Sequence, residues 1–251
     1  MPMDASMLQS VPDLAGENYG SVLDRLHRVL EPASYLEIGT NAGDSLRFAR
    51  CATIAIDPKF SFVSADPLEG KPLCALYQMT SDAFFANHDP RAVLGRPIDM
   101  AFLDGMHLSE FLLRDFMNTE KYCRRNAIIA IHDCVPLDHD MARRDPESAP
   151  SEPNDRPGWW TGDIWRFILL LKRRRQDLRI TVLDAPPTGL VLVTNLSPDS
   201  TLLYDNYARF VEEMHGESLA DLTLAGLHAE LVVEPTSILQ SPGDIAARFW
   251  L

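Results

Sequence analysis

The sequence predicts a single α/β domain built on a doubly wound, mostly parallel sheet. Short apolar strands alternate with helical segments, and each of four strands ends on or beside an acid. These acids are Glu37, Asp57, Asp104 and Asp133. Such an alternation of buried strands and helices is typical of a parallel sheet covered on both faces. Ligands bind these sheets at the carboxyl ends of the strands, so the four acids indicate a binding site there.

The composition is that of an acidic globular protein. With 251 residues, of which 46% are hydrophobic and 24% charged, the chain is long enough to bury a core as one domain. Its net charge of −13 argues against a nucleic-acid partner, because phosphate binding needs a basic face. The basic cluster from Lys172 to Arg175 is too short to reverse this and is interpreted as a solvated helix end.

Cysteine usage and the lack of long apolar runs indicate a cytoplasmic chain. No signal peptide or membrane-length segment is evident, so no membrane partner is expected. The cysteines lack C-x-x-C spacing and lie in or beside hydrophobic segments, so we expect reduced thiols. They are Cys51, Cys74, Cys123 and Cys134.

A strand, a glycine loop and a helical stretch are expected between residues 35 and 49. An apolar run carrying Glu37 leads into a turn bracketed by Gly39 and Gly43, after which helical character resumes. Glycine lets the backbone turn tightly and lets a ligand approach it without meeting a Cβ. Asn41 stands near the place of the second glycine of the dinucleotide fingerprint, so the motif is Glu-x-Gly-x-x-x-Gly instead.

The next two strands add further candidates for this site. A strand over residues 53–57 ends on Asp57, about twenty residues after the first acid, which is the interval expected for a ribose-binding carboxylate. A strand over residues 73–79 is followed by Ser81 and Asp82, where such folds commonly hold adenine. Asp82 has an equally good interpretation as a helix N-cap.

Two later strands deliver the remaining polar residues. One leads to Asp104, with His107 three residues further on, and the other leads to His132 and Asp133. Because neighbouring residues on a strand point to opposite faces, His132 can belong to the site or to the core. These strands are expected over residues 98–103 and 127–131.

The rest of the chain is expected to frame the site. Residues 1–33 are interpreted as a helical lead-in, and residues 135–162, rich in proline, acid and arginine, as a lid-like loop. The base of this loop carries three tryptophans that either pack on the apolar face of a sugar ring or anchor the loop to the core, namely Trp159, Trp160 and Trp165. Residues 200–251 are expected to form a C-terminal helical extension available for contacts in a homo-oligomer. Between loop and extension we expect a helix through Leu171 and closing strands at 179–183 and 189–196.

With these positions in order, the chain resembles the class I S-adenosylmethionine-dependent methyltransferases. The matched residues run from Leu36 to Asp133 and come nearest the group of macrocin-type sugar O-methyltransferases and cephalosporin hydroxylases. The resemblance implies S-adenosylmethionine as cofactor. The residues it implies for cofactor binding are Glu37, Gly39, Thr40, Asn41, Gly43, Ser45, Asp57, Ser81, Asp82 and Asp104.

The same resemblance implies a divalent cation, Mg²⁺ or Mn²⁺, at the strand ends. In that group an acid after the fourth strand and an acid pair after the fifth hold the metal. Asp104 and Asp133 match, whereas His132 stands where the other acid of the pair would be, so the implied ligands are these three. His107 takes the position of the basic residue of the related catechol O-methyltransferases, which implies His107 as general base beside Asp104 as the second catalytic residue.

The expected function is therefore metal-assisted O-methylation of a hydroxyl on a sugar or polyol, free or in an oligosaccharide. A phenol or catechol acceptor is an alternative. A nicotinamide oxidoreductase on the same architecture is disfavoured by Asn41 and by the missing third-glycine spacing. A non-catalytic cofactor-binding protein would bind S-adenosylmethionine without turnover.

Overall fold

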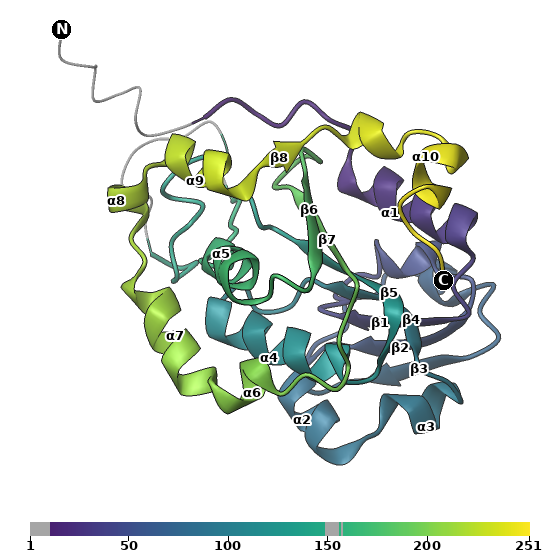
Figure 1. Cartoon of the computed structure of the whole chain (residues 1–251). Helices are drawn as coiled ribbons and strands as arrows, with labels where there is room; N and C mark the ends of the chain where they lie inside the picture. The colour runs from purple at the N-terminus through teal and green to yellow at the C-terminus, as the bar shows by residue number, and fades with distance from the viewer. Residues whose placement is uncertain (1–10, 149–155, 157) are drawn as a thin grey trace, which may run out of the picture.

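The computed structural model of the chain describes residues 11–148, 156 and 158–251 and contains an eight-stranded sheet (Figure 1). The strand order is β3-β2-β1-β4-β5-β7-β6-β8. Strands β1 to β5 are parallel, β7 is antiparallel to β5 and β6, and β8 is parallel to β6. The predicted doubly wound, mostly parallel sheet with an antiparallel closing strand is confirmed. The strands are β1 (Ser34–Ile38), β2 (Ala52–Ile56), β3 (Cys74–Tyr77), β4 (Ile98–Leu103), β5 (Cys123–His132), β6 (Arg179–Leu183), β7 (Leu190–Thr194) and β8 (Val233–Glu234).

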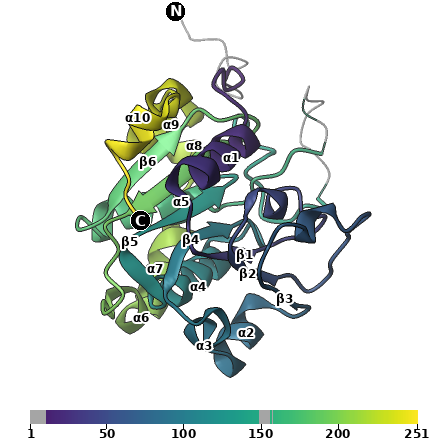
Figure 2. The same ribbon diagram turned by 90° about the vertical axis from the view of Figure 1, so that its right-hand side faces the viewer.

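Helices cover both faces of the sheet. Figure 2 shows α1 and α10 on one side of it and α2, α3 and α4 on the other. Apolar residues of α5, α7 and α9 share the core of the second side. The α-helices are α1 (Tyr19–Leu30), α2 (Ser81–Asn87), α3 (Pro90–Leu94), α4 (Ser109–Glu120), α5 (Trp165–Arg174), α6 (Leu202–Asp205), α7 (Tyr207–Gly216), α8 (Leu219–Leu222), α9 (Leu224–Leu231) and α10 (Pro242–Ala246). Short 3₁₀ helices are η2 (Leu46–Phe48), η3 (Asp66–Leu68) and η4 (Thr236–Leu239).

Strand β4 shows why the strands have continuous apolar sequences. Ala101 and Leu103 point into the core on one face, and Met100 and Phe102 point into the core on the other. All residues of β4 are buried, because successive side chains of a strand face opposite sides and both sides are covered. The sheet is thereby fixed as a rigid layer whose strand ends can hold a site.

The stretch after the glycine loop differs from the helix that we predicted. It forms only η2, a single 3₁₀ turn. Leu46 of this turn is fully buried and shares a core with Leu23 and Leu26 of α1. Helix α1 therefore covers the face that a longer helix after β1 would otherwise cover.

The C-terminal region is part of the domain core. The extension predicted from residue 200 begins with two helices, α6 and α7, which are separated at Asn206, and α7 ends at Gly216. Phe210 and Met214 are buried in the core. Strand β8, which we did not predict, extends the sheet beyond β6.

The basic cluster at the end of α5 is only partly a solvated helix end. Arg173 and Arg174 are exposed and pair with glutamates. Arg175 is 1% exposed and donates to Glu120 at 2.7 and 2.8 Å, so the prediction of a solvated residue is wrong there. A buried guanidinium needs such a bidentate carboxylate partner.

Parts of the predicted lead-in and lid lie outside the described residues, namely 1–10, 149–155 and 157. The lid therefore stays a prediction for that stretch. The residues before and after it are tied to the domain, since Arg144 pairs with Glu110 at 2.6 Å and with the buried Asp163. All four cysteines are free thiols. In the described part of the chain, no helix is long and apolar enough to cross a membrane.

Candidate functional site

A cavity of about 710 Å³ lies at the carboxyl ends of β1, β2, β4 and β5. The residues that follow these four strands line it, together with the starts of α2 and α4. Pro146 and Trp160, on either side of the undescribed stretch, complete the wall. This is the place predicted for the site, because the carboxyl ends of parallel strands converge there.

The glycine loop closes against the end of β4. Gly39 has φ +84°, and a Cβ there would lie 2.0 Å from the carbonyl oxygen of Asp104. Asn41 also has a positive φ, and its backbone N–H donates to Asp57 Oδ2 at 2.8 Å. Asp57 Oδ1 accepts from the N–H of Lys59 at 2.7 Å. Asp57 therefore both lines the cavity and fixes the loop that forms its floor.

Glu37 lies behind this loop. It is fully buried, and the hydroxyl of Tyr35 donates to its carboxylate at 2.6 Å. Burial raises the pKa of Glu37 to about 7, against the opposing effect of hydrogen bonds from Tyr35, Ser45 and Thr40. Among the residues predicted for the cofactor, Glu37, Thr40, Gly43 and Ser45 do not line the cavity, whereas the other six do. The six are Gly39, Asn41, Asp57, Ser81, Asp82 and Asp104.

Asp82 is not the N-cap of α2. Thr80 caps this helix, and its hydroxyl accepts from the N–H of Ala83 at 3.3 Å. The Asp82 carboxylate instead accepts from Arg114 Nε at 2.9 and 3.1 Å. Its charge is therefore already paired at the edge of the cavity.

Two carboxylates and two imidazoles converge at the ends of β4 and β5. His107 Nε2 lies 3.5 Å from Asp104 Oδ1 and 3.3 Å from Asp133 Oδ2. His132 Nδ1 lies 3.4 and 3.3 Å from the same two oxygens. The four side chains predicted for catalysis and metal binding are thus brought together by the fold.

The backbone at the end of β5 explains how His132 and Asp133 can face the same point. Asp133 has φ +57°, a conformation that residues other than glycine rarely adopt. It therefore leaves the strand geometry, in which neighbouring side chains would diverge. The hydroxyl of Thr188 donates to Asp133 Oδ1 and fixes its carboxylate. Such an outlier at a strand end is typical of a functional site.

The charges of this cluster stabilise one another. Burial would raise the pKa of Asp104, but His132 and His107 outweigh it and hold that pKa well below its usual range. Burial would lower the pKa of His132, yet Asp133 and Asp104 raise it to about 10. The pKa of His107 is also raised, because the nearby carboxylates of Asp104 and Asp133 outweigh the effect of burial.

Trp160 holds the ring of His107. The imidazole Nδ1 lies 3.0 Å from the carbonyl oxygen of Trp160, so Nδ1 carries the proton and Nε2 faces the carboxylates. The indole stacks on the imidazole with ring centroids 4.9 Å apart. Trp165, in contrast, is buried in the core, and Trp159 does not line the cavity. Of the three tryptophans, Trp160 alone is placed to meet an acceptor.

Comparison with known proteins agrees with this geometry. Residues 36–134 match the family model described as "Methyltransferase domain". This stretch of the chain is therefore similar to a methyltransferase domain. No curated protein sequence matches the chain.

Solved structures share the fold of this chain. The O-methyltransferase TomG from Streptomyces achromogenes, involved in tomaymycin synthesis and solved in complex with SAM, is 20% identical and has a TM-score of 0.52. The likeness covers 74% of this chain and 84% of TomG. Cofactor-bound Rv0187 from MTB is 14% identical, with a TM-score of 0.50 over 70% of this chain and 78% of that one.

Asp115 is a titratable residue of the cavity that sequence reasoning missed. Asp115 lies in the middle of α4, is 4% exposed and lines the cavity near Ser81. Burial raises the pKa of Asp115 to about 7, although a hydrogen bond from Ser81 opposes this. The sequence does contain a signal for this residue, because Asp115 is an acid on the apolar face of a helix, between Leu112 and Phe116.

We expect Asp115→Asn to flatten the pH dependence of stability. In the unfolded chain this carboxyl titrates near pH 4, so between about pH 4 and 7 the folded state keeps a proton that the unfolded state releases. The contribution of this carboxyl to stability is therefore greatest at low pH and is lost as pH rises toward 7. In urea unfolding, the change in stability between pH 5 and 7.5 should differ between wild type and variant by roughly 2 kcal/mol, with the larger loss in the wild type. An equal loss in both proteins would contradict the role assigned to Asp115. Glu37 contributes a change of the same sign, so the variant keeps a residual slope.

The cluster has the donor set of a divalent-cation site. Oxygen or nitrogen atoms of Asp104, His107 and Asp133 all lie within 4.8 Å of one another. Asp104 Oδ1 and His132 Nδ1 are buried and have no hydrogen-bond partner among the described residues. Carboxylate oxygens with an imidazole suit Mg²⁺ or Mn²⁺, and the histidine favours Mn²⁺. The residues present therefore fit the predicted metal.

Proposed function

We propose that the protein transfers the methyl group of S-adenosylmethionine to a hydroxyl oxygen, with a divalent cation bound at the cluster. The observation that supports this most is the convergence of Asp104, His107, His132 and Asp133 beside the glycine loop of a methyltransferase domain. A cation there would bind the acceptor oxygen, lower its pKa and fix its direction of attack.

We assign the metal to Asp104, His132 and Asp133 and the proton transfer to His107. His132 is the more buried histidine, at 6% exposure, and its Nδ1 faces both carboxylates, as a ligand should. His107 is nearer solvent, and its Nδ1–H is engaged by the Trp160 carbonyl. Its Nε2 is thus directed toward the position where an acceptor hydroxyl would bind. A cation held by Asp104 and Asp133 would offset the negative charges that raise the pKa of His107, so that the neutral imidazole could receive the hydroxyl proton during the transfer.

For the acceptor we propose a sugar or polyol hydroxyl. The indole of Trp160 offers a flat face at the cavity wall, and such faces pack on the apolar faces of sugar rings. A phenol or catechol is the second candidate, because Met106 and Phe111 add an apolar lining that suits an aromatic acceptor. Both candidates need a hydroxyl beside the cluster.

The test is turnover with methyl-labelled S-adenosylmethionine and Mn²⁺ against matched acceptors. Simple sugars and polyols form one set, and catechol with other phenols forms the other. Mass spectrometry should find a labelled methyl ether together with S-adenosylhomocysteine. Titration calorimetry with NAD⁺ should show no binding. Cofactor binding without turnover on any hydroxyl would favour a non-catalytic protein and contradict the proposal.

We expect Asp57→Ala to weaken binding of S-adenosylmethionine by about 30-fold. The variant removes a buried carboxylate that would accept from the ribose hydroxyls and that also fixes the loop at Asn41. Loss of charge-assisted bonds of this kind costs on the order of 2 kcal/mol. Titration calorimetry measures the effect, and Asp66→Ala, an exposed acid in η3, serves as the matched control. Unchanged affinity would remove Asp57 from the cofactor site.

We expect Trp160→Ala to raise the KM for the acceptor roughly tenfold while the affinity for the cofactor stays the same. The indole forms part of the cavity wall and stacks on His107, so its loss removes a packing surface for the acceptor. Trp159→Ala is the matched control, because this neighbouring tryptophan lies outside the cavity lining. A lower melting temperature with an unchanged KM would show that Trp160 only anchors its segment.

A further inference from the structure

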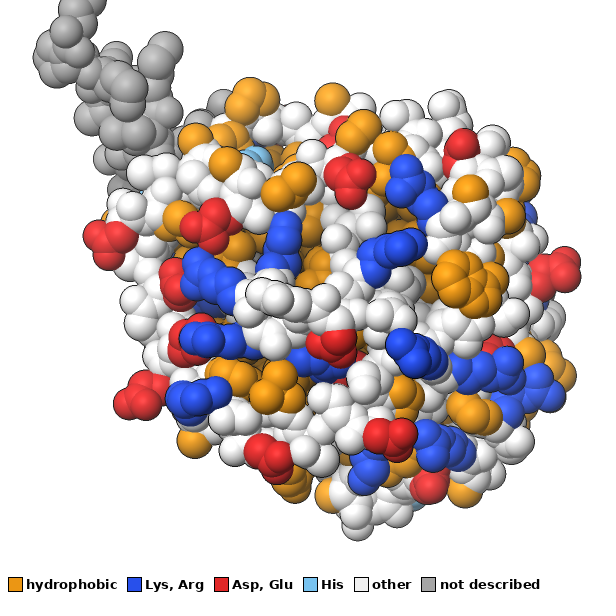
Figure 3. All heavy atoms as spheres, viewed as in Figure 1, with side chains coloured by type: hydrophobic (Ala, Val, Ile, Leu, Met, Phe, Trp, Pro, Cys, Tyr) orange, Lys and Arg blue, Asp and Glu red, His pale blue; other side chains and the backbone are white. Residues whose placement is uncertain are grey.

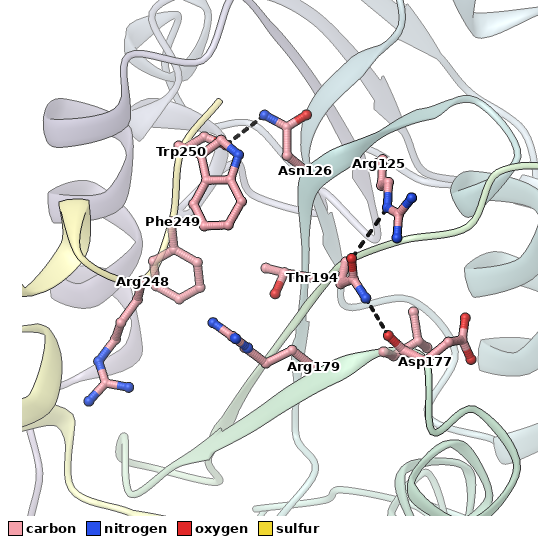
Figure 4. A pocket seen from close by; sticks show the side chains of 10 residues that line it. Arg125, Asn126, Asp177, Arg179, Thr194, Arg248, Phe249 and Trp250 are labelled. Atoms are coloured by element: carbon pink, nitrogen blue, oxygen red, sulfur yellow. Dashed lines mark hydrogen bonds between the residues drawn. The ribbon is translucent and has the colours of Figure 1, made fainter.

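A second cavity, of about 700 Å³, lies at the other edge of the sheet (Figure 4). It is formed by the first part of β5, the start of β6, the end of β7 and residues 248–250. Strand β5 runs from Cys123 to His132, so its early residues are at the end opposite the methyltransferase cluster. The second cavity is therefore separate from the first and of similar volume.

Three arginines line this second cavity: Arg125, Arg179 and Arg248. Within the described part of the chain, no hydrogen bond or ion pair of the Arg179 side chain is found, and the side chain of Arg248 interacts only through its charge, with the carboxylate of Asp244. Arg125 uses only its Nε, which donates to Asn195 Oδ1 at a long 3.4 Å. In Figure 4 the side chain of Arg179 extends from β6 toward the segment that carries Phe249 and Trp250.

The cavity is positively charged although the chain is acidic. The sequence contains 36 acidic residues and 23 lysines and arginines, so carboxylates are in excess over the basic side chains that they could pair with. Asp177 is the one acid that lines the cavity, and Arg175 already binds its carboxylate at 2.8 and 2.9 Å. Figure 3 shows Lys and Arg side chains spread over the face of the molecule seen in Figure 1, with Asp and Glu side chains among them. Unpaired guanidinium groups around a hollow are suited to bind an anion such as phosphate.

An exposed aromatic residue accompanies these charges. Trp250 is 65% exposed, and Asn126 Nδ2 donates to its backbone carbonyl at 2.7 Å. Phe249 beside it is buried and closes the cavity wall. A tethered indole that remains open to solvent offers a face on which a planar ring can stack.

We propose that this second cavity binds a nucleoside phosphate, with the base on Trp250 and the phosphates on Arg179 and Arg248. The volume admits a ligand of that size, since it is close to the volume of the cavity proposed for S-adenosylmethionine. Arg125 adds positive charge at the rim. The proposal concerns a binding site that methyl transfer does not use, and it holds whether or not the protein methylates hydroxyls.

The test is titration calorimetry with GDP, UDP and inorganic pyrophosphate on the full chain. Guanine and uracil nucleotides are chosen because they do not depend on an adenine site in the first cavity. We expect saturable binding of both nucleotides that weakens as salt is added, because charge pairs at the surface are screened. The Arg179→Gln variant should bind roughly tenfold more weakly or worse, and the Arg179→Gln/Arg248→Gln double variant should lose more.

Two further variants locate the site and separate its parts. Trp250→Ala should weaken GDP binding roughly tenfold while leaving pyrophosphate binding unchanged, since only the base stacks on the indole. Arg209→Gln, an exposed arginine on α7, should bind like the wild type. The arginine substitutions are at exposed positions, so melting temperatures should hold. Absence of binding at millimolar nucleotide, or binding that survives the double variant, would overturn the proposal.

Discussion

Turnover by the wild-type protein should stop in excess EDTA and return on addition of Mn²⁺ or Mg²⁺, and Asp133→Asn should abolish this recovery. The substitution keeps the shape of the side chain and an oxygen that can accept from Thr188. It removes the charge that the cluster needs to hold a cation between Asp104 and Asp133. Because Lewis-acid activation of a hydroxyl is worth several kcal/mol, the rate should fall on the order of 10²-fold or more.

A matched control separates loss of the metal from loss of the fold. Asp44→Asn replaces an exposed acid at the same edge of the sheet that pairs only with Arg47 and lies outside the cavity lining. It should keep the metal requirement and the rate. Mn²⁺ affinity, measured by titration calorimetry, should fall in Asp133→Asn and stay unchanged in Asp44→Asn. Full wild-type turnover in EDTA would reject the metal assignment while leaving methyl transfer in place.

Three of the four acids could be predicted at the strand ends, because their positions follow directly from periodicity. A buried strand is recognised in the sequence as a short apolar run. The residue that follows this run is therefore expected at the carboxyl edge of the sheet. This sufficed for Asp57, Asp104 and Asp133. It failed for Glu37, which lies within β1 rather than after it and therefore points into the core beneath the loop.

The remaining features of the site depend on contacts between distant segments. The left-handed backbone conformation of Asp133 is accompanied by a hydrogen bond from Thr188, which lies 55 residues away. No pattern in the neighbouring sequence predicts this conformation. The orientation of His107 depends on a carbonyl at Trp160, 53 residues away. The pKa of Asp115 is raised mainly because the folded chain buries its carboxyl, and the charge of Asp82 adds to this. Sequence periodicity places elements, whereas these properties arise from packing among them.

Arg175 illustrates the same limit for charged residues. Its neighbours Arg173 and Arg174 are solvated, as predicted for the basic run. Arg175 itself, the residue that directly follows α5, is buried. Glu120 at the end of α4 is the partner that makes this burial possible, and it lies 55 residues earlier in the chain. A run of like charges therefore gives the average environment of its members and not that of each one.

Replacing His107 with alanine should lower kcat by roughly 10²–10⁴-fold with little change in affinity for S-adenosylmethionine. The imidazole faces the carboxylates with Nε2, and its other nitrogen is engaged by Trp160, so it can take a proton only from the side of the acceptor. Steady-state assays with methyl-labelled S-adenosylmethionine measure kcat, and titration calorimetry measures the affinity for S-adenosylmethionine. His215→Ala, an exposed histidine on α7, is the matched control and should retain the wild-type rate.

The result can distinguish a general base from a metal ligand, since His107 Nε2 also lies within reach of a cation at the cluster. If His107 is the base, Mn²⁺ affinity should persist in His107→Ala, because Asp104, His132 and Asp133 remain. Added imidazole should then restore part of the rate, since a free base can enter the space that the side chain leaves. His132→Ala should show the opposite pattern, with weakened Mn²⁺ binding and no rescue by imidazole. If His107→Ala instead loses Mn²⁺ affinity and imidazole does not restore its rate, His107 is a metal ligand. That result would reject His107 as the general base.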